Sequence, residues 1–307
     1  MRLNPPNALV VLGPTASGKT RLGVHLAGEL GGEIVSADSR QVYRGLNLGA
    51  GKDPEEYIVD GVAIPHHLID IVDLGHEFSV FEYQRRFHDV FEELRARRVL
   101  PVIVGGTGLY LEAILMRYRM VSVPENSALR TELATWSDRA LVERLTAAKD
   151  RLHNTTDLVN RERLIRAIEI AEYSRDHAPQ PAPDLRPLIL GTQWDRETLR
   201  ARIRKRLMDR VQAGMIEEVH ALRAQGVPWE RLEQLGLEYR FIAEYLQNKI
   251  RTKNDLLQKL YAAICQFAKR QETWFRRMER KGVTIHWAPR ADVEAARQIV
   301  QEHFIGV

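Results

Sequence analysis

The residues with the clearest chemical meaning lie near the N-terminus, in the run Gly13-Pro14-Thr15-Ala16-Ser17-Gly18-Lys19-Thr20. This run fits the pattern G-x-x-x-x-G-K-[ST], in which glycines let backbone N–H groups curl around phosphate oxygens. Lys19 would add a positive charge, and the Thr20 hydroxyl is a suitable ligand for Mg²⁺ beside a phosphate. We therefore predict that residues 13–20 bind a di- or triphosphate.

The phosphate loop alone leaves the reaction open. Kinases and NTPases use such a loop to transfer or hydrolyse a phosphoryl group. The same grip on phosphate oxygens would stabilise a diphosphate that leaves with its bonding electrons. Other residues must decide whether phosphorus or carbon is transferred.

Two further polar runs follow predicted strands, Asp-Ser-Arg-Gln at 38–41 and Gly-Gly-Thr-Gly at 105–108. In parallel α/β sheets, ligands bind at the carboxyl edge, where such runs lie. Asp38 could act as a general base, bind a metal or simply cap a turn, and Ser39 and Gln41 could hydrogen-bond a nucleic-acid base. Thr107 could hold a phosphate oxygen, although a plain tight turn explains the same glycines.

Two histidines and one aspartate give only weak signals for a metal site. His66 and His67 are adjacent at the expected start of a strand at 66–72, where neighbouring side chains point to opposite faces. Asp70 in this run is a weak candidate for a metal-binding acid.

The single cysteine, Cys265, cannot form an internal disulfide, which favours a reducing cytoplasm.

Positive charge gathers in two late segments, although the whole chain carries a net charge of only +4. Residues 251–281 hold nine Lys/Arg and three Asp/Glu, and residues 186–210 hold eight Lys/Arg and three Asp/Glu. Such segregation suits a polyanionic partner, and a solvated, salt-bridged helix face is the alternative.

The segment 269–277 combines basic residues with an aromatic ring in a helical pattern. Lys269, Thr273 and Arg276 share one predicted face, and Arg270 and Trp274 belong to the next. Arginines beside an aromatic side chain suit contact with RNA phosphates and bases. A core tryptophan beside surface charges explains the same pattern, so RNA binding is a hypothesis at this stage.

The elements that must position these residues follow from apolar periodicity. Strands are expected at 8–13, 33–38, 100–106 and 188–193, with a candidate late strand at 283–287. Helices are expected at 19–30 and after Ser79, which forms a capping box with Glu82. The alternation predicts a parallel α/β sheet with right-handed crossovers.

Between about 120 and 187 the pattern changes to helices, and a strand returns at 188. We therefore expect an α/β core of residues 1–119 and 188–307 with an inserted all-helical domain of residues 120–187. A chain of 307 residues is long enough for both. Because no apolar run approaches the roughly 18–20 residues that span a bilayer, no membrane partner is expected.

Together these runs resemble the tRNA dimethylallyltransferases, also called tRNA isopentenyltransferases. The matching segments occur in the family's order along nearly the whole chain, at 13–20, 38–43, 65–70, 105–110, 162–169 and 268–276. The resemblance implies a P-loop kinase-like core, a helical insertion that grips the tRNA anticodon stem-loop, and a central channel. It implies transfer of a dimethylallyl group from dimethylallyl diphosphate to the exocyclic amine of the adenosine on the 3′ side of the anticodon.

The resemblance also assigns roles to residues. Asp38 would take the proton from the attacking amine, while Lys19, Thr107, Arg206 and Mg²⁺ on Thr20 would hold the diphosphate. The residues that it implies for tRNA binding are Asp38, Ser39, Arg40, Gln41, Arg130, Arg163, Arg166, Lys269, Arg270, Gln271, Thr273, Trp274 and Arg276. The expected protein is a cytoplasmic monomer whose partners are tRNA and dimethylallyl diphosphate.

Two segments depart from the family pattern. Relatives typically carry a Gly-Tyr-Lys/Arg turn where this chain has Glu238 before Tyr239 and Arg240, which puts the tRNA contacts of that turn in doubt. Relatives often have His-Pro-Asn-Asp where residues 153–157 read His-Asn-Thr-Thr-Asp. The zinc-finger extension of eukaryotic relatives is not expected, because the chain has a single cysteine.

Three other functions fit part of the sequence. A small-molecule or nucleotide kinase accounts for the phosphate loop but not for the basic segment 269–277. An adenylate isopentenyltransferase would use the same chemistry on a free nucleotide, and it could dispense with the insertion and the basic segment. An RNA-binding module without catalysis would not need the phosphate loop or Asp38.

Overall fold

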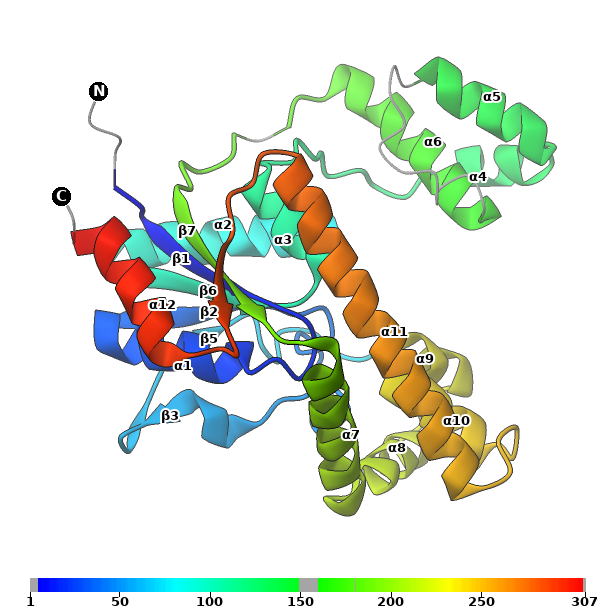
Figure 1. Ribbon diagram of the computed structural model, residues 1–307. Coiled ribbons are helices and arrows are strands. Elements are labelled where there is room, and N and C mark those ends of the chain that lie inside the picture. Colours follow the sequence, from blue (N-terminus) through cyan, green and yellow to red (C-terminus); the bar gives the residue numbers. More distant parts are fainter. Residues whose placement is uncertain (1–4, 149–159, 180, 306–307) are drawn as a thin grey trace. The chain divides into compact units, whose positions relative to one another are not determined.

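The computed structural model describes residues 5–148, 160–179 and 181–305. The chain forms two compact units (Figure 1). Unit 1 comprises Met1–Arg117 and Pro183–Val307, and unit 2 comprises Tyr118–Ala182. The helical segment is thus inserted into the first unit, as its change of periodicity predicts.

Unit 1 contains the strands and most of the helices. Its strands are β1 (Ala8–Leu12), β2 (Gly32–Ala37), β3 (Ile58–Val59), β4 (Val62–Ala63), β5 (His66–His67), β6 (Leu100–Gly105), β7 (Pro187–Gln193) and β8 (His286–Pro289). Its α-helices are α1 (Lys19–Leu30), α2 (Val80–Ala96), α3 (Gly108–Leu115), α7 (Arg196–Gln212), α8 (Met215–Ala224), α9 (Trp229–Gln234), α10 (Leu237–Leu246), α11 (Lys253–Arg280) and α12 (Val293–Val300). Short helical turns lie at Pro54–Tyr57 (3-10) and Gln301–Ile305 (π).

Six parallel strands form one sheet in the order β5-β2-β6-β1-β7-β8. The phosphate-loop strand β1 lies between β6 and β7, so residues that follow these three strands leave the sheet side by side (Figure 1). Leu12 of β1 and Ala37 of β2 are both in register with Gly105 of β6. This confirms the predicted parallel α/β core and brings the three polar runs to one edge.

Alternate residues of β1 supply the cores on the two faces of the sheet, as the strand period of two requires. Leu9 and Val11 pack in a cluster with residues of α1 and α12, including Leu22 and Val300. Ala8, Val10 and Leu12 pack on the other face, in a cluster that includes side chains of α2, α3 and the end of α11. All five β1 residues are buried, which explains their continuous apolar run.

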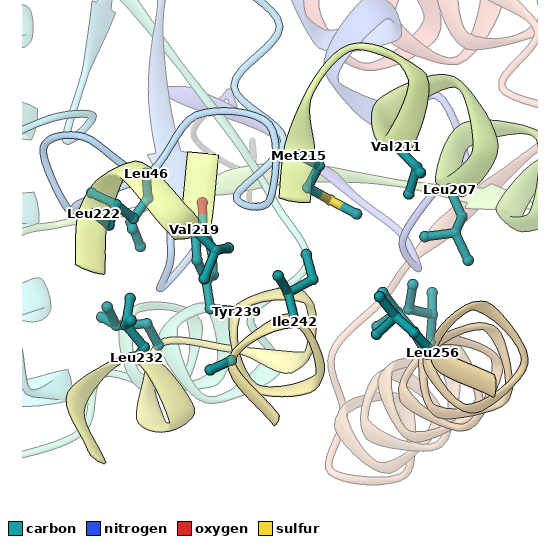
Figure 2. Close-up of a cluster of buried hydrophobic side chains, with 14 of the residues drawn as sticks. Leu46, Leu207, Val211, Met215, Val219, Leu222, Leu232, Tyr239, Ile242 and Leu256 are labelled. Atoms are coloured by element: carbon teal, nitrogen blue, oxygen red, sulfur yellow. The ribbon is translucent and has the colours of Figure 1, made fainter. Parts of the chain in front are cut away.

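A third core lies among the helices α7 to α11 (Figure 2). Leu207 and Val211 of α7, Met215 of α8, Ile242 of α10 and Leu256 of α11 meet in it and are buried. It also takes in Leu46, Tyr43 and Val42, from the segment that follows β2. The helices therefore fix the segment after β2 against α7, and this segment contains residues of the candidate site.

Unit 2 consists of α4 (Ser127–Ala134), α5 (Asp138–Ala148) and α6 (Arg161–Asp176). It has a core of its own, made by the buried residues Leu133, Leu141, Leu145, Leu164, Ala167, Ile168 and Ala171. Asn126 and Asn160 cap α4 and α6 through side-chain oxygens that accept N–H bonds from Leu129 and Arg163. The departure from the family pattern at 153–157 lies outside the described residues.

The predictions that depend on a few neighbouring residues agree with the structure. Helix α1 has the predicted bounds and ends at Gly31, whose φ of 63° suits glycine. Ser79 and Glu82 make both bonds of the capping box at the start of α2. The late strand β8 begins at His286, three residues beyond the predicted start at 283. Unit 2 ends at Ala182 rather than 187, because the buried Leu185 packs in the core of unit 1.

The predicted strand over 66–72 is wrong beyond His67. Leu68 and Asp70 have φ values of 62° and 54°, which are incompatible with an extended strand. His67 bonds Glu33 across the parallel pair at 2.7 Å. Asp70 pairs with Lys52, whose ammonium is buried. His67 thus hydrogen-bonds Glu33, and Asp70 forms an ion pair with Lys52, so both side chains have partners within the protein.

We predict that Ile168→Ala destabilises unit 2 locally. Ile168 is fully buried in the core of unit 2, and such a truncation typically costs about 2–5 kcal/mol. Hydrogen exchange measured by mass spectrometry should show faster exchange in α5 and α6 and unchanged protection in β1 and β6. Ile103→Ala, in the sheet core, should give the reverse pattern. Equal loss of protection in both units after Ile168→Ala would contradict two separate cores.

Candidate active site

The three polar runs open on one cavity of about 610 Å³, which is the size of a typical ligand site. Its walls come from the phosphate loop, the segment after β2, the loop after β6, helix α7, the turn before α10 and helix α11. All of these segments belong to unit 1. Predicted residues that line it include Lys19, Thr20, Asp38, Thr107 and Arg206.

The phosphate loop is held open by partners that bind its outward-facing carbonyls. Ala16 and Gly18 take φ values of 61° and 86°, which let the loop curl. Arg202 Nε donates to Ala16 O at 2.8 Å, and Trp194 Nε1 donates to Ser17 O at 2.8 Å. These bonds fix two carbonyls of the loop, and a loop curled in this way can present backbone N–H groups to an anion.

Lys19 sits at the first turn of α1, where N–H groups lack intrahelical partners. Its ammonium donates to Pro14 O at 3.3 Å, which places it inside the loop. Burial and the neighbouring Arg206 lower the pKa of Lys19 to about 8. A bound diphosphate would offset both effects, since an opposite charge favours the ammonium form.

Asp38 and Thr107 are brought together by the neighbouring strands β2 and β6. Thr107 Oγ1 accepts the N–H of Ser39 at 3.0 Å, and its own N–H donates to Ala37 O at 3.2 Å. One oxygen of Asp38 accepts the N–H of Arg40 at 2.8 Å. The loop is therefore fixed by bonds on both sides of Asp38, which itself lines the cavity.

The family resemblance implies that Gln41 contacts tRNA. In the structure, its side chain is buried and hydrogen-bonded within the protein. Its Oε1 accepts from Ser36 Oγ at 2.8 Å, and its Nε2 donates to Gly51 O at 3.1 Å. Gly51 has a φ of 71°, and the Arg206 guanidinium packs directly on it. Gln41 thus positions the segment against which the arginine rests.

Helix α7 presents three arginines to the cavity at a spacing of four, Arg202, Arg206 and Arg210. The prediction identified only Arg206, although the i, i+4, i+8 spacing on one face could have found all three. Arg210 pairs with Asp53 at 2.8 Å, and Arg206 lies 4.0 Å from the same carboxylate. Burial lowers the pKa of Arg206, and Arg210 adds to this effect.

Acidic side chains in the cavity were missed by the prediction. Glu56 and Glu238 line it together with Asp53. Burial raises the pKa of Glu56, with a further contribution from Asp53. Burial also raises the pKa of Glu238, while Arg210 and Arg206 act in the opposite direction. The residue that departs from the family pattern therefore lies in the cavity, near its arginines.

The predicted tRNA-binding residues on helix α11 differ in their exposure. Lys269, Arg270, Thr273 and Arg276 are exposed. Trp274 is half-buried, with the Arg277 guanidinium 4.1 Å from its ring centroid. Gln271 is buried and bonds the phosphate loop and the loop after β6. The exposed basic side chains of α11 are therefore accessible to a polyanion outside the protein.

Two of the three predicted arginines of unit 2 share an internal partner. Arg130 and Arg166 both pair with the buried Glu169, and Arg130 Nη2 lies 3.0 Å from it. Burial raises the pKa of Glu169, but the bonds from Arg130 and Arg166 more than offset this, so that its pKa is lowered overall. Arg163 is exposed on α6. Among the described residues, no group of three or more His, Cys, Asp or Glu is arranged to hold a metal ion.

Comparisons with known proteins agree with this architecture. The family model described as IPP transferase matches residues 41–278, and the one described as isopentenyl transferase matches residues 6–62. A tRNA dimethylallyltransferase 1 from Geotalea uraniireducens is 59% identical over 281 residues, which cover 92% of each chain. One from Syntrophus aciditrophicus is 53% identical over 295 residues, covering 95% of this chain and 96% of its own.

Solved structures agree as well. A full-length tRNA isopentenylpyrophosphate transferase from Bacillus halodurans has a TM-score of 0.69 at 31% identity, covering 98% of this chain and 96% of that one. A eukaryotic dimethylallyltransferase acting on tRNA has a TM-score of 0.79 at 20% identity, over 98% of this chain and 80% of that one, which supports the fold alone. No helix among the described residues is long and apolar enough to cross a membrane. Because a family model covers most of the chain and relatives share over half of its residues, the chain belongs to the IPP transferase family of tRNA dimethylallyltransferases.

Proposed function

We propose that this enzyme transfers a dimethylallyl group from dimethylallyl diphosphate to the exocyclic amine of the adenosine on the 3′ side of a tRNA anticodon. The observation that carries the proposal is that the phosphate loop and Asp38 line the same cavity. A diphosphate held at the loop would present its allylic carbon to an amine held near Asp38. The names of the relatives support tRNA as the acceptor.

The chemistry needs a leaving-group site and a proton acceptor. The amine nitrogen forms a bond to the allylic carbon, the carbon–oxygen bond to the diphosphate breaks, and the electron pair leaves with the diphosphate. Asp38 takes the proton of the amine. An adenine amine is a weak nucleophile, so its extrusion from the stack and its alignment with the carbon supply much of the rate.

Positively charged groups would hold the diphosphate of the substrate. Lys19, Arg206 and the N–H groups at the start of α1 would neutralise the departing oxygens, with Thr107 beside them. Mg²⁺ typically binds one or two protein oxygens together with phosphate oxygens and water, so the Thr20 hydroxyl in the cavity wall fits it. When bound, Mg²⁺ would neutralise part of the negative charge on the diphosphate.

The acceptor end is served by a basic surface. The exposed residues Lys269, Arg270 and Arg276 of α11 suit backbone phosphates, and Arg163, Arg130 and Arg166 of unit 2 suit the anticodon stem-loop. We propose that the enzyme acts as a monomer, in keeping with a cavity whose described walls all belong to unit 1. We place it in the cytoplasm, where tRNA is modified in a reducing environment.

The direct test incubates the purified enzyme with unmodified tRNA, dimethylallyl diphosphate and Mg²⁺, followed by nucleoside mass spectrometry. We expect dimethylallylated adenosine in tRNA, a product that depends on Mg²⁺ and disappears with a chelator. A free adenine nucleotide offered in place of tRNA tests the adenylate isopentenyltransferase alternative. Phosphorylated product from ATP and candidate acceptors, without prenylated tRNA, would instead establish a kinase.

We predict that Asp38→Ala lowers turnover by about 10²–10⁴-fold, the usual contribution of a general base. Asp38 is a small part of the RNA-facing surface, so the Kd for tRNA should remain within about threefold of wild type, a change below about 0.7 kcal/mol. Single-turnover kinetics and filter binding measure the two quantities. An equal loss of tRNA binding would show that Asp38 mainly positions the nucleotide.

We predict that Arg206→Ala weakens binding of pyrophosphate about 10- to 100-fold, because hydrogen bonds between charged groups are among the strongest in proteins. Arg200→Ala is the matched control, since Arg200 is exposed on the same helix and does not line the cavity. Isothermal titration calorimetry with Mg²⁺ present gives both affinities. Equal affinities for the two variants would remove Arg206 from the diphosphate site.

A further inference from the structure

Helix α11 carries one polar side chain in its buried stripe. The buried positions recur every three or four residues along 28 residues of helix: Leu256, Leu260, Ile264, Ala268, Gln271, Phe275 and Met278. Gln271 is 6% exposed, at a position where this spacing calls for an apolar residue. A buried amide without partners would be costly, so its bonds show what it does.

Both ends of the Gln271 amide bond the backbone of the diphosphate site. Thr15 N–H in the phosphate loop donates to Oε1 at 2.8 Å, and Nε2 donates to Gly106 O at 2.7 Å. A backbone N–H can only donate and a carbonyl can only accept, so the orientation of the amide is fixed by its partners. A carboxylate or an apolar side chain of the same length can satisfy at most one of the two groups.

The loop after β6 approaches α11 closely enough to require glycine. A Cβ on Gly106 would lie 2.5 Å from Gln271 Nε2 and 3.4 Å from Lys19 Cε. A Cβ on Gly108 would lie 2.5 Å from Cγ of Trp274. The Gln271 amide therefore packs directly on Gly106, close to the Lys19 side chain.

We propose that Gln271 is a positioning residue for the diphosphate end of the site and that it does not contact RNA. It joins the start of the phosphate loop to the carbonyl next to Thr107, and so sets the separation between the anion cradle and the Asp38–Thr107 pair. This proposal rests on the proposed function. It reassigns Gln271, because its sequence neighbours Lys269, Arg270 and Thr273 face outward while its own amide faces the loops.

The test compares Gln271→Met, which removes both bonds at nearly constant volume, with Gln271→Glu, which keeps the acceptor for Thr15 N–H but adds a negative charge beside Lys19. Isothermal titration calorimetry measures binding of pyrophosphate with Mg²⁺, filter binding measures tRNA, and steady-state kinetics give KM for each substrate and kcat. Thermal melting reports stability. Gln258→Met and Gln258→Glu are matched controls, because Gln258 is exposed on the same helix.

We expect Gln271→Met to weaken pyrophosphate binding about tenfold, in line with the loss of two hydrogen bonds, and Gln271→Glu to weaken it further. KM for dimethylallyl diphosphate should rise with the pyrophosphate Kd, while KM and Kd for tRNA stay within about twofold of wild type. Thermal melting should place both variants below wild type, because each leaves the carbonyl of Gly106 without its donor. A merely structural role would weaken the binding of pyrophosphate and of tRNA together as the melting temperature falls.

Several results would overturn the inference. A raised Kd and KM for tRNA, with unchanged pyrophosphate binding, would show that Gln271 contacts RNA. Lys269→Ala serves as the reference variant for that result. Pyrophosphate affinity equal to that of the Gln258 variants, or pyrophosphate and tRNA affinities that fall together with the melting temperature, would remove its positioning role. If Gln271→Met does not fold, the comparison of Gln271→Glu with Gln258→Glu decides the matter. Pyrophosphate binding needs no turnover, so failure of the wild-type enzyme to prenylate tRNA is a separate outcome.

Discussion

The site depends on three parallel strands that end level with one another. Leu12 of β1 and Ala37 of β2 are both in register with Gly105 of β6, so the segments that follow leave the sheet together. Gly105 admits this approach because a Cβ would overlap the carbonyl of Ala37. The ladder thus fixes the phosphate loop beside Thr107 and Asp38. Backbone pairing thus brings the ends of the strands to one edge, and the Gln271 amide then links the phosphate loop to the loop after β6.

The cavity holds positively and negatively charged side chains close together, although burial disfavours the charged form of both kinds. Burial lowers the pKa of Lys19 and Arg206 and raises the pKa of Glu56. Arg210 forms an ion pair with Asp53, whereas the hydrogen bond of the Lys19 ammonium goes to the neutral carbonyl of Pro14. An incoming diphosphate would therefore stabilise the charged form of Lys19 most, and binding of the anion and protonation of this lysine reinforce each other. The arginines on α7 add a second cationic wall.

The sequence was most informative where a local rule decides the structure. The phosphate loop, the bounds of α1 and the capping box at Ser79 each follow from a few neighbouring residues. The strand beyond His67 failed because Asp70 turns into the left-handed region to meet Lys52, a partner 18 residues away. The roles of Gln41 and Gln271 could not be predicted either, since both bond backbone groups, Gly51 O and Gly106 O, that only the fold brings within reach. Family resemblance identified both residues as important and left their bonding undetermined.

Helix α11 carries exposed basic side chains on one face and contacts the phosphate loop with the other. Gln271 of the helix bonds the phosphate loop, and Glu112 of α3, which is fully buried, pairs at 2.5 Å with Arg277 of the helix and with Lys281 just beyond its end. Leaving such a carboxylate without partners would cost several kcal/mol, roughly 3–5 when one partner of a buried pair is removed. The helix is thus held against the loops by polar contacts that tolerate little sliding. Lysines and arginines on its outer face therefore stand at a fixed distance from the phosphate loop. If RNA binds that face, as we propose, the helix itself would place the RNA relative to the diphosphate.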